Sequence, residues 1–337
     1  MRKKLYVCLT YYHTLITLVK SLVNDEKYVI YLNNNIPEYA DLKERLEATG
    51  RFEIIEYPGI EMKKDVKVYD NAVLRLLLSP KEYSRVVNKF CNLNLRDYEL
   101  YLYHDYSLMG RYCVINKIPY HLIEDALDYF KYFDQYYNVP ANSYNKGSFK
   151  FFLKEKLGMG YRLWGSSPYC IDIEVNDKNG IKIHSDKVFE VPRRELFDSL
   201  TAEQRISVYR TYAAGKTIDE GKGKSAILCT QPLFSAGHVS SMADQLKVFE
   251  EVVKNFQKDG FHIVIKPHPR DDADYSGVIN QYGCGYIDKN LPSEILNYDP
   301  DARFDAAISI TSTAINFLNY ADEKIFMGME FVQEVLS

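Results

Sequence analysis

The sequence lacks the features that mark several large classes of protein. Its six cysteines lie far apart, with no CxxC pair and no zinc-ligand spacing, which is typical of reduced thiols in a cytoplasmic protein. No apolar run approaches the roughly 18 residues that a membrane span needs, and the N-terminal stretch has no signal-peptide cleavage site. The net charge of −4 provides no basic field for nucleic acid.

Several catalytic signatures are also missing. The chain has no GxSxG nucleophile elbow, and no GxGxxG follows a predicted strand, which disfavours a Rossmann dehydrogenase. The segment GKGKS at residues 221–225 lacks the first glycine of a phosphate-binding loop and precedes a strand instead of following one. Two acid-x-acid pairs, Asp272–Asp274 and Asp299–Asp301, lie in polar loop sequence, so solvated charge explains them better than a bound metal.

Segments typical of strands and helices alternate along the chain, which predicts an α/β protein with parallel, doubly wound sheets. The strand-like segments of the first half are KLYVCLT, KYVIYLNN, RFEIIEYPG, ELYLYHD and YHLIED. An aromatic-rich stretch after about residue 130 interrupts the pattern, and GKTIDEGKGK has the composition of a linker. We therefore predict a first Rossmann-like domain at 1–214 with an aromatic-rich insertion, a linker at 215–224 and a second Rossmann-like domain at 225–337.

Two adjacent carboxylates, Glu124 and Asp125, end the predicted strand YHLIED. Neighbouring residues of a strand point to opposite faces of a sheet, so one can enter a cleft while the other supports the loop. A carboxylate in a cleft is a plausible general base. Asp125 could equally cap the helix predicted in ALDYF, and the sequence leaves these two roles evenly balanced.

The stretch IKPHPRD places His268 between two prolines, directly after the apolar run FHIVI. Proline cannot donate to a strand ladder, so the strand ends here and His268 lies on a stiff loop at its carboxyl end. In α/β folds ligands bind at that edge of the sheet. The flanking cations Lys266 and Arg270 favour a phosphate. A structural turn histidine is the alternative.

The stretch SITSTAINF, residues 309–317, predicts the end of a strand and the start of a helix. The hydroxyls of Thr311, Ser312 and Thr313, with the free amides of a helix N-terminus, form an anion site without a metal. For this stretch alone, ordinary helix capping is the simpler explanation. Together with His268 and the carboxylates of the first half, it suggests a nucleotide donor held across a cleft.

In their order along the chain, these three motifs resemble those of the bacterial sialyltransferases with a GT-B fold. The most similar group is glycosyltransferase family 52, which includes the lipooligosaccharide sialyltransferases. That family has an acid-acid-Gly motif, an His-Pro motif and a Ser/Thr motif, matched here by Glu124-Asp125-Ala126, His268-Pro269 and Ser312-Thr313. The segments VPRRELF and LCTQPL also resemble stretches of the family. The resemblance covers most of the chain in sparse patches, and implies two Rossmann-like domains that face each other across a cleft.

The resemblance assigns a role to each matching residue. Asp125 resembles the family's general base and His268 its general acid. The residues assigned to the donor are the phosphate-binding pair Ser312 and Thr313, the ribose-binding Glu294, and Lys266 and Pro269 beside His268. Ala126 replaces the motif glycine. If that glycine needs a positive φ or a close ligand approach, Asp125 is placed differently here, and either the activity or the specificity differs from that of the family.

The expected activity is an inverting, metal-independent transfer of sialic acid from CMP-sialic acid to a terminal sugar, with galactose as first choice. The acceptor is a bacterial surface glycan such as lipooligosaccharide or capsule polysaccharide. No cofactor beyond the donor and no nucleic acid is expected. A cytoplasmic location is predicted, while a homodimer and peripheral contact with the inner face of the membrane, through FKFFLKEKLGMGYRLW, are left open. The alternatives are another nucleotide sugar, or an inactive nucleotide- or glycan-binding protein.

Overall fold

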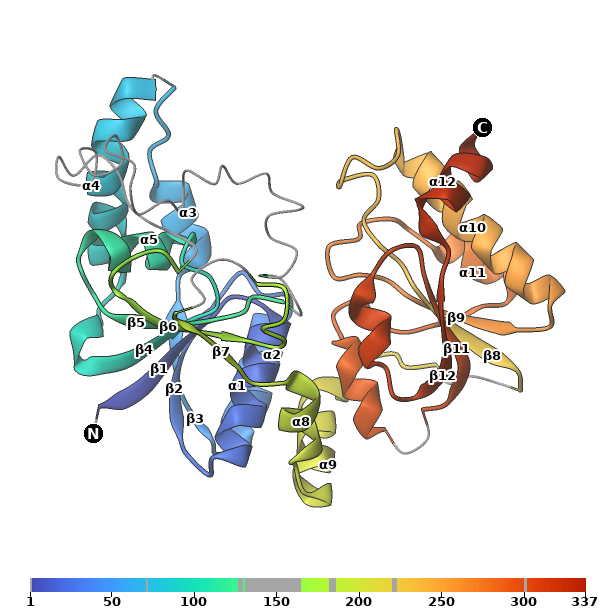
Figure 1. Cartoon of the computed structure of the whole chain (residues 1–337), viewed down its shortest axis with the longest axis horizontal. Coiled ribbons are helices and arrows are strands. Elements are labelled where there is room, and N and C mark those ends of the chain that lie inside the picture. The colour runs from blue at the N-terminus through green and yellow to red at the C-terminus, as the bar shows by residue number, and fades with distance from the viewer. Residues whose placement is uncertain are drawn as a thin grey trace. The chain divides into compact units, whose positions relative to one another are not determined.

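The computed structural model describes residues 2–70, 72–126, 130, 165–181, 186–219, 223–299 and 302–337, with the side chains of 72–77 and 313–314 left aside. The chain divides into two compact units, Met1–Leu200 and Thr201–Ser337. Each unit is an α/β structure (Figure 1). Most of the aromatic-rich insertion, including the segment FKFFLKEKLGMGYRLW, lies outside the described residues.

The first unit is built on a parallel sheet, in which seven strands are described. They are β1 (Lys3–Cys8), β2 (Tyr28–Asn33), β3 (Phe52–Tyr57), β4 (Tyr98–Leu102), β5 (Tyr120–Ile123), β6 (Cys170–Val175) and β7 (Val188–Glu190). Their order in the sheet is β3-β2-β1-β4-β5-β6-β7, and every neighbouring pair is parallel. The doubly wound parallel sheet predicted from the alternation is therefore confirmed.

Helices connect these strands. They are α1 (Tyr11–Val23), α2 (Tyr39–Ala48), α3 (Gly59–Asp65), α4 (Ala72–Phe90), α5 (Leu108–Ile115) and α8 (Arg193–Asp198), with the 3₁₀ turn η1 (Leu95–Asp97). The hydroxyl of Thr10 starts α1 by accepting a hydrogen bond from the amide of His13 at 3.2 Å. Nearly all of α1 is buried, and its sequence is rich in apolar residues with a few polar side chains among them. The Thr10 cap fixes where α1 begins, and with it the position of His13.

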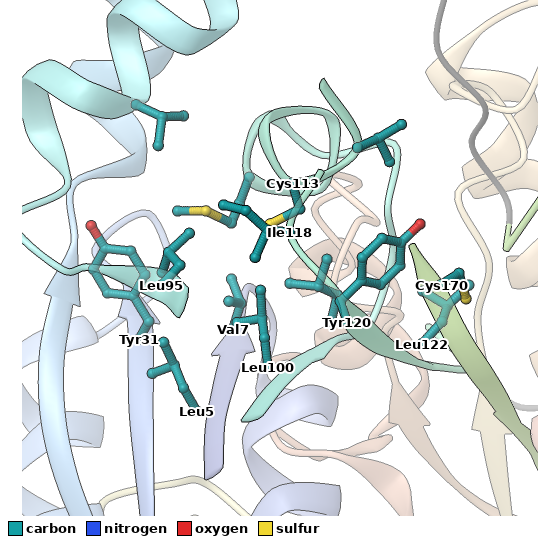
Figure 2. Close-up of a cluster of buried hydrophobic side chains, with 14 of the residues drawn as sticks. Leu5, Val7, Tyr31, Leu95, Leu100, Cys113, Ile118, Tyr120, Leu122 and Cys170 are labelled. Carbon is teal, nitrogen blue, oxygen red and sulfur yellow. The ribbon is translucent and has the colours of Figure 1, made fainter. Parts of the chain in front are cut away.

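The two faces of the first sheet differ in chemistry. Leu5, Val29 and Leu100 are in register on neighbouring strands and point to one face, where they join a large apolar cluster. Figure 2 shows this cluster, in which Cys113 of α5 and Ile118 lie over the side chains of the strands. Full burial of such a side chain contributes roughly 1.5–3 kcal/mol. This face is therefore a main source of the unit's stability.

On the opposite face, neighbouring rings cross the strands as an aromatic ladder made of Tyr28, Tyr6, Tyr101 and His121, from β2, β1, β4 and β5. Successive ring centroids lie 4.8, 4.5 and 4.7 Å apart, which is close to the distance between neighbouring strands. His121 extends the contact to β6, because its Nδ1 lies 2.9 Å from the carboxylate of Asp172. The ladder and this pair connect five adjacent strands.

The structure adds two strands, β6 and β7, that were not predicted from the sequence, and β6 is the one in the interior of the sheet. Asp172 and Glu174 interrupt the apolar run expected of a buried parallel strand. A register shift where β6 pairs with β5 also breaks the alternation. Glu174 is nevertheless buried, because Lys20 of α1 and Arg193 of α8 both pair with its carboxylate. This buried ion-pair group was not foreseeable from the local sequence.

The second unit also contains a parallel sheet, with the described order β10-β9-β8-β11-β12. Its strands are β8 (Ser225–Cys229), β9 (His262–Lys266), β10 (Gly285–Tyr286), β11 (Phe304–Ser309) and β12 (Ala321–Phe326). Its helices are α9 (Ala202–Ala213), α10 (Met242–Lys258), α11 (Ser276–Tyr282) and α12 (Gly328–Leu336), with 3₁₀ turns η3 (Ser293–Tyr298) and η4 (Thr313–Phe317). The strand order reverses between β8 and β11, the usual place for a ligand in such sheets.

The second unit begins before the predicted linker at 215–224. Helix α9 belongs to it, because α9 packs against η3 and the hydroxyl of Tyr209 donates to Asp299 Oδ2 at 2.8 Å. The division therefore follows Leu200 and not residue 214, and α9 joins the residues predicted as the donor-binding domain at 225–337. In the part of the chain that the structure describes, no helix is long and apolar enough to cross a membrane.

Candidate active site

Four side chains converge at the carboxyl edge of the first sheet, and we call them the Asp125 cluster. His13 lies in the first turn of α1, directly after β1. His104 and Tyr106 follow β4, and Asp125 follows β5. Because β1, β4 and β5 are neighbours in the sheet, their carboxyl-terminal loops meet. The strand order reverses between β1 and β4, so the cluster lies where ligands bind in open α/β sheets.

Asp125 is the centre of this cluster. Its Oδ1 lies 2.6 Å from Nε2 of His13, and its Oδ2 accepts a hydrogen bond from the Tyr106 hydroxyl at 3.2 Å. Nε2 of His104 is 3.9 Å from Oδ1, which is too far for a hydrogen bond. The side chain of His13 is fully buried, whereas that of Asp125 is 22% exposed. The carboxylate is therefore hydrogen-bonded to a buried imidazole on one side and remains accessible to a small group on the other.

The cluster keeps Asp125 ionised. Burial raises the pKa of its carboxyl, but the hydrogen bond and electrostatic attraction of His13, then His104 and Tyr106, more than offset this and lower the pKa to about 2. Burial lowers the pKa of His104 to about 4 against the attraction of Asp125, so this imidazole is neutral near pH 7. The unprotonated carboxylate is the form that a general base needs.

The neighbouring Glu124 lies in different surroundings. It is 1% exposed, and its carboxylate accepts hydrogen bonds from the amides of Phe130 and Asn176 at 3.0 and 2.8 Å. Glu124 thus supports the loop while Asp125 faces the cluster. Ala126, at the position of the motif glycine, is exposed and is not among the described residues with positive φ. Alanine therefore fits this position without backbone strain.

No motif in the sequence indicated His13, His104 or Tyr106. His13 is 112 residues from Asp125 along the chain, and only the order of the strands brings the two together. One signal was available: His13 and Tyr106 follow the predicted strands KLYVCLT and ELYLYHD, and His104 lies near the end of the second, at the strand ends where functional side chains gather.

In the second unit, His268 lies on the loop after β9, as its two prolines predict. Its Nδ1 accepts a hydrogen bond from the amide of Arg270 at 3.0 Å, so Nε2 is the nitrogen left for a ligand. Burial, followed by the positive charges of Arg270 and Lys266, lowers the pKa of His268 to about 4. The imidazole is therefore neutral near pH 7 and carries its proton on Nε2, where it can donate to an oxygen.

Asp271 holds the His268 loop in shape. It is 1% exposed, and its amide donates to the carbonyl of His268 at 2.8 Å. Its carboxylate accepts hydrogen bonds from four groups, which are Thr230 Oγ1, Gln245 Nε2, Tyr275 OH and the amide of Ala273. These donors come from the loop after β8, from α10 and from the segment before α11. Asp271 therefore links the loop to several parts of the second unit.

We expect Asp271→Ala to lower the free energy of unfolding by about 2–4 kcal/mol, because it leaves several buried donors without an acceptor. Urea unfolding followed by circular dichroism measures this change. Asp272→Ala is the matched control, since that side chain is 83% exposed, and it should change stability by less than ~0.5 kcal/mol. Equal small losses in both variants would contradict the role given to Asp271.

The residues predicted to bind the donor near His268 differ in burial. Lys266 is buried, and its ammonium donates to the carbonyls of Pro267 and Lys289 at 2.9 and 3.1 Å. Burial lowers the pKa of Lys266 to about 8. Glu294 of η3 is 9% exposed and burial raises its pKa, whereas Pro269 is exposed. Lys266 thus supports backbone of this loop, and the donor contacts assigned to these residues stay predictions.

Gln231, in the stretch LCTQPL, connects the ends of β8 and β11. Its Oε1 accepts a hydrogen bond from the amide of Thr311 at 2.9 Å, and its Nε2 donates to Thr311 Oγ1 at 3.0 Å. The amide of Ser312 donates to Ser309 Oγ at 3.2 Å. The helix expected after Ser312 is only the five-residue turn η4, which begins at Thr313. Because the amides of Thr311 and Ser312 already donate within the protein, an anion at this segment would meet hydroxyls and only a small helix dipole.

Comparison with known proteins identifies relatives of the chain. A model described as Glycosyltransferase family 52 matches residues 24–328. An uncharacterized protein of Haemophilus influenzae is 28% identical over 155 residues, which are 45% of this chain and 47% of that protein. The alignment thus spans about half the length of this curated relative.

Two solved structures resemble the chain in fold. The GT-B domain of a sialyltransferase from Photobacterium damselae has a TM-score of 0.55 at 11% identity, and the match covers 96% of this chain and 89% of that one. Another sialyltransferase structure, from Photobacterium damsela, has a TM-score of 0.49 at 12% identity, covering 96% of this chain and 74% of that one. The first of these likenesses, with two parallel α/β units, shows a fold of the GT-B type.

Proposed function

The chain belongs to glycosyltransferase family 52, and from this premise we propose that it transfers sialic acid from CMP-sialic acid to a terminal galactose of a bacterial surface glycan. The acceptor hydroxyl attacks the anomeric carbon while the bond from that carbon to the phosphate of CMP breaks. A single displacement of this kind inverts the anomeric configuration and needs no metal. The proposal places the reaction in the cytoplasm, at the inner face of the membrane.

The observation that best supports this proposal is the Asp125 carboxylate. It is ionised at neutral pH, partly exposed, and hydrogen-bonded at the carboxyl edge of its sheet. In the proposed reaction Asp125 takes the proton of the acceptor hydroxyl as the new carbon–oxygen bond forms. Even a weakly basic carboxylate can accept the proton in such a concerted step, because the hydroxyl becomes strongly acidic as that bond develops.

The second unit would meet the charge that develops on CMP. The Nε2–H of His268 is available as a donor, and the prolines and Asp271 fix its loop. The segment with Thr311 and Ser312, tied by Gln231, offers further hydroxyls. Fixed donors aimed at a leaving phosphate stabilise it in the transition state more than in the ground state. In this proposal a negative phosphate beside His268 also favours its protonation, so the same residue can act as the acid.

Two other functions compete with this proposal. A related enzyme would use another nucleotide sugar, because contacts to phosphate do not select the sugar. An inactive nucleotide- or glycan-binding protein is the second alternative. The feature that suggests it is Ala126, which replaces the motif glycine. The unstrained backbone at Ala126 and the ordered Asp125 cluster favour an active enzyme over that alternative.

The direct test is release of CMP from CMP-sialic acid in the presence of EDTA, with and without a galactose-terminated oligosaccharide. We expect release that depends on the acceptor and persists in EDTA. UDP-glucose serves as the comparison donor. If UDP-glucose is turned over faster than CMP-sialic acid, the proposed donor is wrong. A rise in Tm with CMP but no turnover of either donor would favour the binding protein.

A further inference from the structure

His13 uses both ring nitrogens inside the first unit. Its Nδ1 accepts a hydrogen bond from the amide of Leu9 at 3.0 Å, and its Nε2 lies 2.6 Å from Oδ1 of Asp125. The ring stacks on Tyr103, with centroids 4.1 Å apart and planes 5° from parallel. Tyr103 is held in turn by the hydroxyl of Thr17 at 2.8 Å. These contacts fix both the position and the orientation of the imidazole ring.

The contact with Leu9 determines where the proton of His13 lies. A backbone amide can only donate, so Nδ1 must present a lone pair. The proton of the neutral ring then resides on Nε2 and points at the carboxylate of Asp125. Protonation of Nδ1 would set two N–H groups against each other in a site without solvent. His13 therefore offers its Nε2–H to Asp125 as a hydrogen-bond donor.

We infer that His13 is the positioning residue of Asp125, which it holds through its Nε2–H donor so that Oδ2 is the oxygen that receives the acceptor proton. This inference rests on the proposed transferase function. Oδ1 is committed to His13 at 2.6 Å, while among the described residues Oδ2 has only the longer bond of 3.2 Å from the Tyr106 hydroxyl. An incoming hydroxyl can displace the weaker of these two partners.

Within the described part of the chain, the groups that face Asp125 come from two elements. His13 approaches from α1, and His104 and Tyr106 approach from the loop after β4. The ring of His104 also lies at an edge-on angle to that of His13, with centroids 5.9 Å apart. Of these three described side chains, His13 alone has a short hydrogen bond to the carboxylate. Its removal should therefore shift the titration of Asp125 more than removal of either neighbour.

The test compares His13→Phe, which retains a flat ring without a donor, with His13→Gln, whose amide can place a donor near the original Nε2. We expect His13→Phe to lower kcat about 10–100-fold with KM for the donor within about 3-fold. The acid limb of the pH profile of kcat/KM should move to higher pH, by about one pH unit or more, because a carboxylate that loses a donor binds its proton more tightly. His13→Gln should restore most of kcat and the original acid limb.

His121→Phe is the matched control, because His121 also pairs with an aspartate on the same sheet but lies outside the Asp125 cluster. It should leave kcat within about 2-fold and the acid limb unmoved. Equal losses in the Phe and Gln variants of His13, with the acid limb unchanged, would mean that His13 only fills space, and would overturn the inference.

A second measurement does not depend on activity. Nitrogen-15 NMR of labelled histidines distinguishes the two neutral tautomers and the imidazolium, and the chain has seven histidines to assign. The signal that vanishes in His13→Gln should be that of an Nε2–H tautomer with an unprotonated Nδ1, as the contact with Leu9 requires. An imidazolium or an Nδ1–H tautomer would overturn the inference. If the tautomer is as expected and no donor is turned over, the proposed function fails while the geometry of His13 stands.

Discussion

Replacing Asp125 with alanine is expected to lower kcat for sialic acid transfer by about 10²–10⁴-fold, the range typical of a lost general base. The acceptor hydroxyl would then attack without a group to take its proton. Binding of CMP should change little, because the groups proposed to hold CMP belong to the second unit. The Asp125 side chain is partly exposed, so water can replace it beside His13 and the fold should survive.

Single-turnover kinetics with CMP-sialic acid measure this loss, and Asp172→Asn provides the control. Asp172 also pairs with a histidine on the same sheet, at 2.9 Å from His121, but it lies outside the Asp125 cluster. The control should keep kcat within about 2-fold of the wild type. If Asp125→Ala keeps more than about a tenth of the wild-type kcat, another group acts as the base.

Replacing His268 with alanine should lower kcat by about 10²–10³-fold, as expected for a lost donor to a developing anion. The Kd for CMP should rise much less, because His268 acts on charge that appears as the glycosidic bond breaks. Isothermal titration with CMP and steady-state kinetics separate the two effects. The exposed His238→Ala, also in the second unit, is the control and should behave like the wild type.

His268→Gln distinguishes two roles for the imidazole. A glutamine amide can donate a hydrogen bond near the position of Nε2 but cannot transfer a proton. Because the pKa of His268 is lowered to about 4 and Nδ1 accepts from Arg270, we expect the neutral donor to matter most and His268→Gln to exceed His268→Ala about 10-fold in kcat. Equal activities of these two variants would show that His268 works by proton transfer. A loss confined to CMP binding would leave only a phosphate contact.

The sequence predicted the fold well where strands are apolar throughout. Buried parallel strands such as β1, β2 and β9 are continuous apolar runs, because helices cover both faces of the sheet. β6 was missed because Asp172 and Glu174 look like loop residues until Lys20 and Arg193 are known to lie beside Glu174. Secondary structure is local, but the pairing that permits a buried carboxylate is not.

The same contrast applies to the candidate site. Asp125 and His268 were predicted because each follows a strand in a short motif, and a strand end is visible in the local sequence. Their partners are set by strand order: His13 meets Asp125 because β1 lies two strands from β5, and Gln231 meets Thr311 because β8 lies beside β11. No local pattern contains that information. The helix after Ser312 was overestimated because its apolar spacing also suits a short 3₁₀ turn.

The aromatic ladder has a consequence for how faithfully the first sheet assembles. A slip of one residue in β1, β4 or β5 would turn a ring onto the apolar face and place an aliphatic side chain among the rings. A slip in register would thus destabilise the packing on both faces of the sheet at once. The ladder therefore favours the correct register of β1, β4 and β5, the strands whose carboxyl ends are followed by His13, His104 and Asp125. The positions of these side chains at the carboxyl edge thus depend on rings that take no part in the chemistry.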